Sequence, residues 1–403
     1  MTRIYLDYAA ATPVDKRVLT RMEPFWSETF GNAGAIHEEG VHAKKALEDS
    51  RKIIATELGV NTDEIVFTGS ATESVNMALR GSISAWKKLH PNRIPHLIVS
   101  EIEHAAVLES TNLLEQEGVR VTRLPIDVQG IVSLDALSEA LSHDTVLVSI
   151  MYANNEIGTI QPILDIAKLL RKWRKEFRGV TRERKSAGDE RYPLLHTDAC
   201  QATNYVELRI PSLGVDLLTI NAAKIYGPKG VAILYIARHT PVESLIVGGG
   251  HEHGRRAGTE NIPLIVGLQE ALLLAREIRD VESARLTVLR DNTHALLLRT
   301  FPNIILNGEL AHQLPNMLNF TFPDVDHEFL ALALDARGFA VSTKSACNEF
   351  DAETSHVLHA LRIASGSTAP ASGIRITLGR GTVEEDLLSL VQAINEIREK
   401  MIY

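Results

Sequence analysis

Short apolar segments alternate with longer stretches in which apolar residues recur every three or four positions. The short segments have the composition of buried strands, and the longer stretches have the period of amphipathic helices. Chains that alternate strands and helices build a mainly parallel sheet covered by helices on both faces. We therefore predict an α/β fold for the first part of the chain. The predicted strands are 64–68, 96–100, 145–151, 192–195, 217–220 and 231–236, and the predicted helices are 37–58, 105–117 and one that begins near Glu73.

The rest of the chain has a different pattern. With 403 residues, the chain is long enough for one large core and a smaller one. A long helical stretch, 262–300, leads into a smaller α+β unit. We predict a large domain over 16–262 and a small domain formed by 1–15 and 263–403. The small unit has predicted strands at 304–306, 317–322 and 339–341, and predicted helices at 326–335 and from 383 onward.

Composition excludes several classes of protein. The net charge of −9 argues against general nucleic-acid binding. No apolar run is long enough to span a bilayer, and the N-terminus does not have the pattern of a signal peptide. Cys200 and Cys347 are the two cysteines, too few for a disulfide framework or a four-cysteine metal site. We expect a soluble cytoplasmic protein that uses no metal.

Two charged residues follow predicted strands. Lys224 comes shortly after the strand that ends at Ile220, just before a Gly-Pro turn, and Asp198 closes the preceding strand. A lysine that forms a Schiff base and an aspartate that pairs with a pyridinium nitrogen are the two protein groups that pyridoxal 5'-phosphate (PLP) chemistry requires. Taken alone, the pair is equally compatible with solvated or ion-paired side chains.

Three further segments carry candidate chemistry. Small residues before a helix, ending in Ala71 and Thr72, suit a phosphate, although they also suit a simple helix cap. Arg375 has the guanidinium geometry that binds a carboxylate through two hydrogen bonds. Cys347 lies in a polar loop beside Lys344, which favours a reactive thiolate, whereas Cys200 has the character of a buried filler residue.

Several short motifs follow one another in a fixed order. They are Ala71-Thr72-Glu73-Ser74, Glu103-His104, Asn154-Asn155-Glu156-Ile157-Gly158, His196-Thr197-Asp198-Ala199-Cys200-Gln201, Lys224-Ile225-Tyr226-Gly227-Pro228-Lys229-Gly230, Gly248-Gly249-Gly250-His251-Glu252, Gly258-Thr259 and Ser345-Ala346-Cys347. The ordered set resembles the group I cysteine desulfurases of PLP fold type I, in the class-V aminotransferase-like superfamily. The resemblance covers nearly the whole chain.

The resemblance implies a reaction and roles for residues. L-cysteine would become L-alanine, with its sulfur held as a persulfide on Cys347 and passed to an iron–sulfur scaffold or a sulfur-relay protein. A homodimer is implied, in which Thr259 reaches the phosphate of the neighbouring subunit. The implied catalytic residues are Lys224, Cys347 and His104; the implied cofactor contacts are Ala71, Thr72, His104, Asn155, Asp198, Gln201, Asn221, Lys224 and Thr259; the implied substrate contacts are Asn32, Asn155 and Arg375.

Two departures from the family pattern concern the phosphate. The family has Ser-Gly where this chain has Gly69-Ser70, and it has a serine and a histidine where this chain has Asn221 and Ala223. An amide can still donate a hydrogen bond, but an alanine side chain cannot. We therefore expect weaker phosphate binding, with Arg255 or Arg256 as possible compensation.

Alternatives remain open at this point. A selenocysteine lyase, an aminotransferase or a non-catalytic scaffold could share the fold, and Cys347 argues against an aminotransferase. The basic stretch 171–191 suits a solvated loop, or else a docking site for an acidic protein or tRNA. His251, Glu252 and His253 lie too close together on a glycine-rich loop to suggest a metal site.

Overall fold

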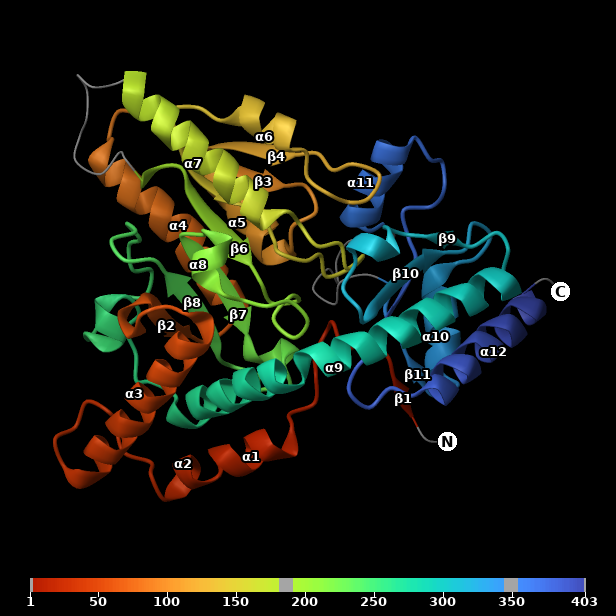
Figure 1. Cartoon of the computed structure of the whole chain (residues 1–403), viewed down its shortest axis with the longest axis horizontal. Helices are drawn as coiled ribbons and strands as arrows, with labels where there is room; N and C mark the ends of the chain where they lie inside the picture. The colour runs from red at the N-terminus through yellow and green to blue at the C-terminus, as the bar shows by residue number, and fades with distance from the viewer. Residues whose placement is uncertain (1–2, 181–190, 344–353, 402–403) are drawn as a thin grey trace.

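The computed structural model describes residues 3–180, 191–343 and 354–401. A seven-stranded sheet forms its centre, in the order β2-β8-β7-β6-β5-β3-β4 (Figure 1). β8 runs antiparallel to both of its neighbours, and the remaining pairs are parallel. The predicted α/β fold is therefore confirmed. The strands are β2 (Ile65–Thr68), β3 (His96–Ser100), β4 (Arg120–Leu124), β5 (Thr145–Ser149), β6 (Leu194–Asp198), β7 (Leu217–Asn221) and β8 (Ala232–Ile236).

Helices cover both faces of this sheet, and every strand except the edge strand β4 is buried along nearly its whole length. α4 and α5 pack on one face, and α3, α7 and the first half of α9 pack on the other. α4 begins earlier than predicted, because the Ser70 hydroxyl accepts from the Glu73 amide and caps the helix. The helices are α1 (Lys16–Met22), α2 (Pro24–Ser27), α3 (Glu38–Leu58), α4 (Ala71–Leu89), α5 (Ala105–Gln116), α6 (Leu134–Ala140), α7 (Ile163–Val180) and α8 (Ile210–Leu213).

The long helix α9 (Ile262–Thr300) joins the two cores (Figure 1). Its buried side chains up to Ala275 belong to the large core, whereas Leu286 and Leu297 belong to a second cluster. That cluster contains two small sheets, β12-β10-β9 and β1-β11. The elements of the smaller part are β1 (Ile4–Tyr5), β9 (Ile305–Leu306), β10 (Met317–Thr321), α10 (His327–Asp335), β11 (Phe339–Ala340), β12 (Ile374–Thr377) and α12 (Glu384–Met401). α11 (His356–Ser365) also follows α9 in the sequence, but its buried side chains belong to the large core.

The N-terminal strand belongs to the smaller core. β1 pairs in parallel with β11, and Leu6 lies fully buried in the second cluster. The next residues lead across to α1, which packs on α9. The domain boundaries expected from the sequence stay a prediction.

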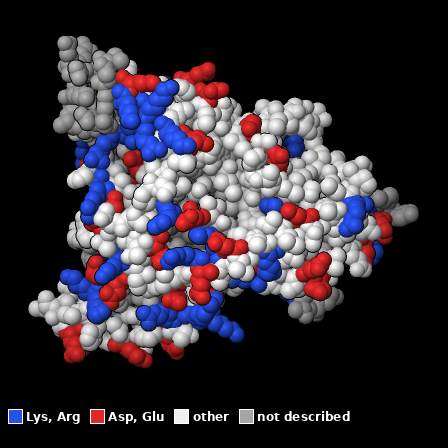
Figure 2. Space-filling model, viewed as in Figure 1, with Lys and Arg blue, Asp and Glu red and all other residues white. Residues whose placement is uncertain are grey.

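The prediction of a solvated loop at 171–191 was wrong for its first part. α7 extends to Val180, so the basic residues up to Arg178 are helical. Arg174 turns inward and pairs with Asp216 at 2.8 Å, whereas other basic side chains are exposed and gather over α7 at the upper left of Figure 2. Residues 181–190 lie outside the described ranges. None of the helices that the structure describes has the length and apolar character that a membrane crossing demands.

Candidate active site

Lys224 is presented by a tight turn after β7. Residues Ala222–Lys224 form one 3-10 turn, so the side chain lies beyond the end of the strand. Its Nζ donates to the carbonyl oxygens of Ala9 at 2.8 Å and of Ala10 at 2.6 Å. The backbone of Ala223 in turn accepts from the Thr12 hydroxyl at 3.0 Å. The N-terminal segment therefore forms one wall around the lysine.

Asp198 is the last residue of β6, the strand beside β7. One of its carboxylate oxygens accepts from the Cys200 amide at 2.9 Å. Burial, followed by the charge and hydrogen bonding of Asp198, raises the pKa of the Cys200 thiol well above its ordinary value. That thiol is therefore held in its neutral form. Gln201, on the same turn, donates from its amide to the carbonyl oxygen of Ala9 at 3.0 Å.

His104 and Asn155 come from the ends of two further strands. His104 follows β3 and caps α5, because its Nδ1 accepts from the Ala106 amide at 3.1 Å. Asn155 lies in the turn after β5, and its carbonyl oxygen accepts from Nη1 of Arg375 at 2.8 Å. In an α/β sheet with parallel strands, ligands bind where the carboxyl ends of the strands meet.

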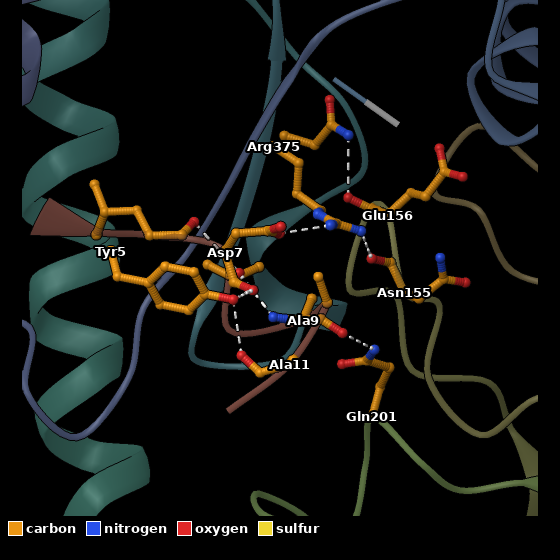
Figure 3. A network of polar contacts seen from close by, with 12 residues as sticks. Tyr5, Asp7, Ala9, Ala11, Asn155, Glu156, Gln201 and Arg375 are labelled. Atoms are coloured by element: carbon orange, nitrogen blue, oxygen red, sulfur yellow. Dashed lines mark hydrogen bonds and ion pairs between the residues drawn. The ribbon is translucent and has the colours of Figure 1, made fainter. Parts of the chain in front are cut away.

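Arg375 reaches the same place from β12 of the smaller core. Its side chain is only 2% exposed, and its Nη2 lies 2.7 Å from an Oδ1 of Asp7. Figure 3 shows the guanidinium held between Asp7 and the Asn155 backbone. Its Nε is buried and has no hydrogen-bond partner among the described residues. A guanidinium with an unused donor is suited to bind an anion that enters the pocket.

The first turn of α4 closes another side of the site. Ala71 and Thr72 line the cavity, and the positive end of the helix dipole lies there. The Asn221 side-chain oxygen accepts from the Ala223 amide at 3.1 Å, which leaves its NH2 group as the donor of that side chain. The inverted Gly69-Ser70 pair makes Ser70 the helix cap.

These groups surround a cavity of about 170 Å³. It brings together the ammonium of Lys224 and the carboxylate of Asp198, the two groups that PLP requires, with an imidazole and a helix N-terminus that suits a phosphate. The cavity lining includes the predicted residues Ala71, Thr72, His104, Asn155, Asp198, Gln201, Asn221, Lys224 and Arg375, together with Ala9, Ala10, Ala106, Met151, Ala153 and Cys200. The donor set therefore fits PLP.

Two predicted residues that the structure describes, Thr259 and Asn32, do not line this cavity. Thr259 lines a separate cavity of about 220 Å³ with Arg256 and Gly258. Asn32 lies in a loop, where its side chain accepts from the Gly34 amide at 2.8 Å. Cys347 lies outside the described residues.

Arg256, proposed from the sequence as a phosphate contact, pairs with Glu73 of its own chain at 2.8 Å. Glu252 also has partners within its own chain. It is buried, forms an ion pair with Arg51 at 2.7 Å and accepts a hydrogen bond from the Phe67 amide at 2.8 Å. This ion pair fixes the loop that leads to Thr259.

Sequence reasoning missed residues that hold the site together. The Ala9 and Ala10 carbonyls were not recognised because backbone acceptors have no sequence signal, and Asp7 was not recognised because its partner Arg375 is 368 residues away. Glu156 was quoted as part of a motif without a role, yet its carboxylate accepts from the Ser355 hydroxyl at 2.5 Å. A buried acidic residue inside a strand-end turn could have indicated such a contact.

Comparisons with known proteins agree with this geometry. The model of the family "Aminotransferase class-V" matches residues 4–178 and 183–390. The chain is 42% identical to the "Cysteine desulfurase IscS" of Dictyoglomus turgidum, covering 99% of this chain and 95% of that protein. It is 38% identical to the "Putative cysteine desulfurase IscS 1" of Bacillus subtilis, covering the whole of both chains at 100%.

Solved structures give the same result. A "NIFS-LIKE PROTEIN" superposes with a TM-score of 0.86 at 35% identity, covering 99% of this chain and 100% of that one. A structure titled "SspA in complex with cysteine" has a TM-score of 0.76 at 34% identity, covering 95% of this chain and 100% of that one. The chain belongs to the class-V aminotransferase family, in the group that contains the cysteine desulfurases.

Proposed function

We propose that this protein is a PLP-dependent cysteine desulfurase, which converts L-cysteine to L-alanine and holds the sulfur as a persulfide on Cys347. The observation that carries the proposal is the convergence of Lys224, Asp198 and Arg375 on one cavity. Lys224 and Asp198 supply the two groups that PLP needs, and Arg375 supplies a site for an amino-acid carboxylate. The names of the relatives and the cysteine complex of a structural neighbour support the choice of substrate.

When bound, PLP supplies an electron sink for the α-carbon of an amino acid. Among the described residues that line the cavity, Lys224 is the lysine, so its amine would hold the cofactor. Asp198 would pair with the ring nitrogen, and the first turn of α4 with Thr72 would hold the phosphate. His104 and the Lys224 amine, once free, are the groups that can exchange protons with the substrate.

Asn155 and Arg375 would bind the substrate together. Arg375 would hold the carboxylate, and the Asn155 side chain lines the cavity beside it. Gln201 and Asn221, which also line the cavity, complete the proposed set of cofactor contacts. Asn32 is proposed as a further substrate contact, and it does not line this cavity.

The sulfur transfer balances without a further reactant. The Cys347 thiolate attacks the sulfur of the substrate, so a sulfur–sulfur bond forms while the bond between sulfur and the β-carbon breaks. The electron pair of the broken bond stays with the carbon, which takes up a proton and becomes the methyl group of alanine. Cysteine and one thiol thus give alanine and one persulfide.

The proposal includes a cytoplasmic homodimer. A homodimer is supported by Thr259, which lies in a second cavity, as expected if it serves the phosphate of a neighbour. The two-cysteine composition supports a reducing compartment. The acceptor would be an iron–sulfur scaffold or a sulfur-relay protein, and the exposed basic side chains of α7 offer one place for an acidic acceptor to dock.

The deciding experiment measures alanine and sulfide released from L-cysteine, with PLP and a thiol reductant added. The wild type is expected to form both in equal amounts. Lys224→Ala should lose the borohydride-reducible bond to PLP. Cys347→Ser should keep the cofactor but form no persulfide, whereas Cys200→Ser should keep both.

Each alternative gives a different result. Keto acid formed instead of alanine would indicate an aminotransferase, and turnover of selenocysteine without turnover of cysteine would indicate a selenocysteine lyase. Bound PLP without turnover of either substrate would indicate a scaffold. Undiminished sulfur transfer by Cys347→Ser would refute the assigned nucleophile.

A further inference from the structure

The guanidinium of Arg375 is neutralised before any substrate arrives. Asp7 provides the only ion pair of Arg375 among the described residues, at 2.7 Å, and the arginine side chain is 2% exposed (Figure 3). The second contact, to the carbonyl oxygen of Asn155, carries no formal charge. The negative charge of Asp7 therefore neutralises the buried guanidinium of Arg375.

The backbone holds Asp7 firmly in this position. Its carbonyl oxygen accepts from the Ala10 amide at 3.0 Å and from the Tyr5 hydroxyl at 2.9 Å. Asp7 also forms a β-bridge with Thr377, two residues after Arg375 on the same segment. The carboxylate cannot move far from the guanidinium unless this local structure opens.

A substrate carboxylate on Arg375 then meets two opposite effects. It can use the guanidinium donors that Asp7 and Asn155 leave free, since arginine has five N–H donors. It must also approach a second carboxylate on the same small cation, which repels it. Asp7 therefore orients the guanidinium and at the same time lowers its affinity for a carboxylate.

We propose that Asp7 is a positioning residue that sets how loosely Arg375 holds the substrate carboxylate. This inference rests on the proposed function. L-cysteine and L-alanine carry the same carboxylate, so a clamp that binds it tightly would retain the product. Asp7 keeps this binding weak enough for L-alanine to leave.

The test uses Asp7→Asn in the PLP-loaded protein. Asparagine has the same shape and keeps an oxygen for Nη2 of Arg375, so the exchange removes the charge and retains the hydrogen bond. Calorimetric titration measures the Kd of L-alanine and of propionate, a carboxylate without an amine. Both are expected to bind about tenfold to a hundredfold more tightly than to the wild type.

Two controls isolate the ion pair. Asp15 forms a similar ion pair with Arg380, at 3.0 Å. Asp15→Asn removes that pair and should leave the Kd values of L-alanine and propionate unchanged. In an Arg375→Met background, Asp7→Asn should no longer tighten binding. If Asp7→Asn folds poorly, Asp7→Ser tests the same loss of charge with a smaller side chain.

Kinetics give a second readout. Asp7→Asn should lower KM for L-cysteine and should also lower kcat, because product release slows, and added L-alanine should inhibit it more strongly. Equal or weaker propionate binding by both Asp7 variants would overturn the inference. Propionate needs no turnover, so this result is distinct from a failure of the proposed desulfurase reaction.

Discussion

Glu103 is a fully buried carboxyl group one residue before His104, and replacing it by glutamine should stabilise the protein as the pH rises. Its Oε1 accepts from the Ser100 hydroxyl at 2.6 Å and from the Met151 amide at 2.9 Å. Its Oε2 is buried without a hydrogen-bond partner among the described residues. Burial, with a smaller contribution from the charge of Asp198, raises the pKa of Glu103 from 4.5 to about 8. The carboxyl group is therefore protonated in the folded protein at neutral pH.

The sign of the effect follows from proton binding. Between pH 4.5 and about 8 the folded state retains a proton on Glu103 that the unfolded state has released. The free energy of unfolding is thus highest below this range and falls as the pH rises through it, by about 1.4 kcal/mol per pH unit. At pH 7 the loss amounts to about 3 kcal/mol.

Glu103→Gln removes this titration and keeps the acceptor for Ser100 and Met151. The difference in free energy of unfolding, variant minus wild type, should increase by about 2 to 3 kcal/mol from pH 5.5 to pH 7.5. Urea unfolding at several pH values, with the same PLP concentration for each protein, measures this slope. Glu139→Gln, on the exposed side of α6, is the matched control for loss of a carboxylate. A pH-independent difference for Glu103→Gln would refute the protonated state inferred from its burial.

Three further changes test contacts around the site. Ala223→His adds a side-chain donor near the phosphate position and should tighten PLP binding about tenfold to a hundredfold, as measured by cofactor titration against the wild type; unchanged affinity would show that the phosphate is held elsewhere. Ser355→Ala removes the 2.5 Å hydrogen bond to Glu156 and a helix cap, so thermal unfolding should show a loss of about 2 to 3 kcal/mol, which Ser355→Thr largely restores; equal losses in both variants would contradict this role. Glu252→Ala removes the closer of the two acidic partners of the buried Arg51 and should cost about 3 to 5 kcal/mol in chemical unfolding, whereas a loss below 1 kcal/mol would show that Glu48, at 3.7 Å, or water compensates.

The sheet and the strand-end residues could be predicted because their signals are local. Lys224 and Asp198 each follow an apolar run, and adjacent parallel strands end at the same edge of a sheet. The extent of α7 was missed because its last turns are rich in charged residues, which suit a loop as well as the exposed face of a helix.

Contacts between distant segments could not be predicted. Asp7 and Arg375 are 368 residues apart, and Glu156 and Ser355 are 199 residues apart. Neither pair belongs to a periodic pattern, and each forms only when segments far apart in the sequence fold together. The role proposed for Thr259, at the phosphate of a second subunit, is not tested by the structure of a single chain.

The N-terminal segment explains how the two cores can share one cavity. Asp7 holds Arg375 of β12, while the Ala9 and Ala10 carbonyls hold the Lys224 ammonium beyond β7. Because the segment begins in β1, paired with β11, its position is fixed by the smaller core.

A shift of this segment would therefore change both contacts. The amine proposed to hold the cofactor and the guanidinium proposed to hold the substrate lie on different cores. Their partners are nevertheless close together in the sequence, because Asp7 contacts the guanidinium and the Ala9 and Ala10 carbonyls contact the amine. Packing of the smaller core thus controls the distance between the two groups that must act on the same amino acid. Substitutions that loosen the pairing of β1 with β11 should impair both PLP retention and cysteine binding, even though they touch neither ligand.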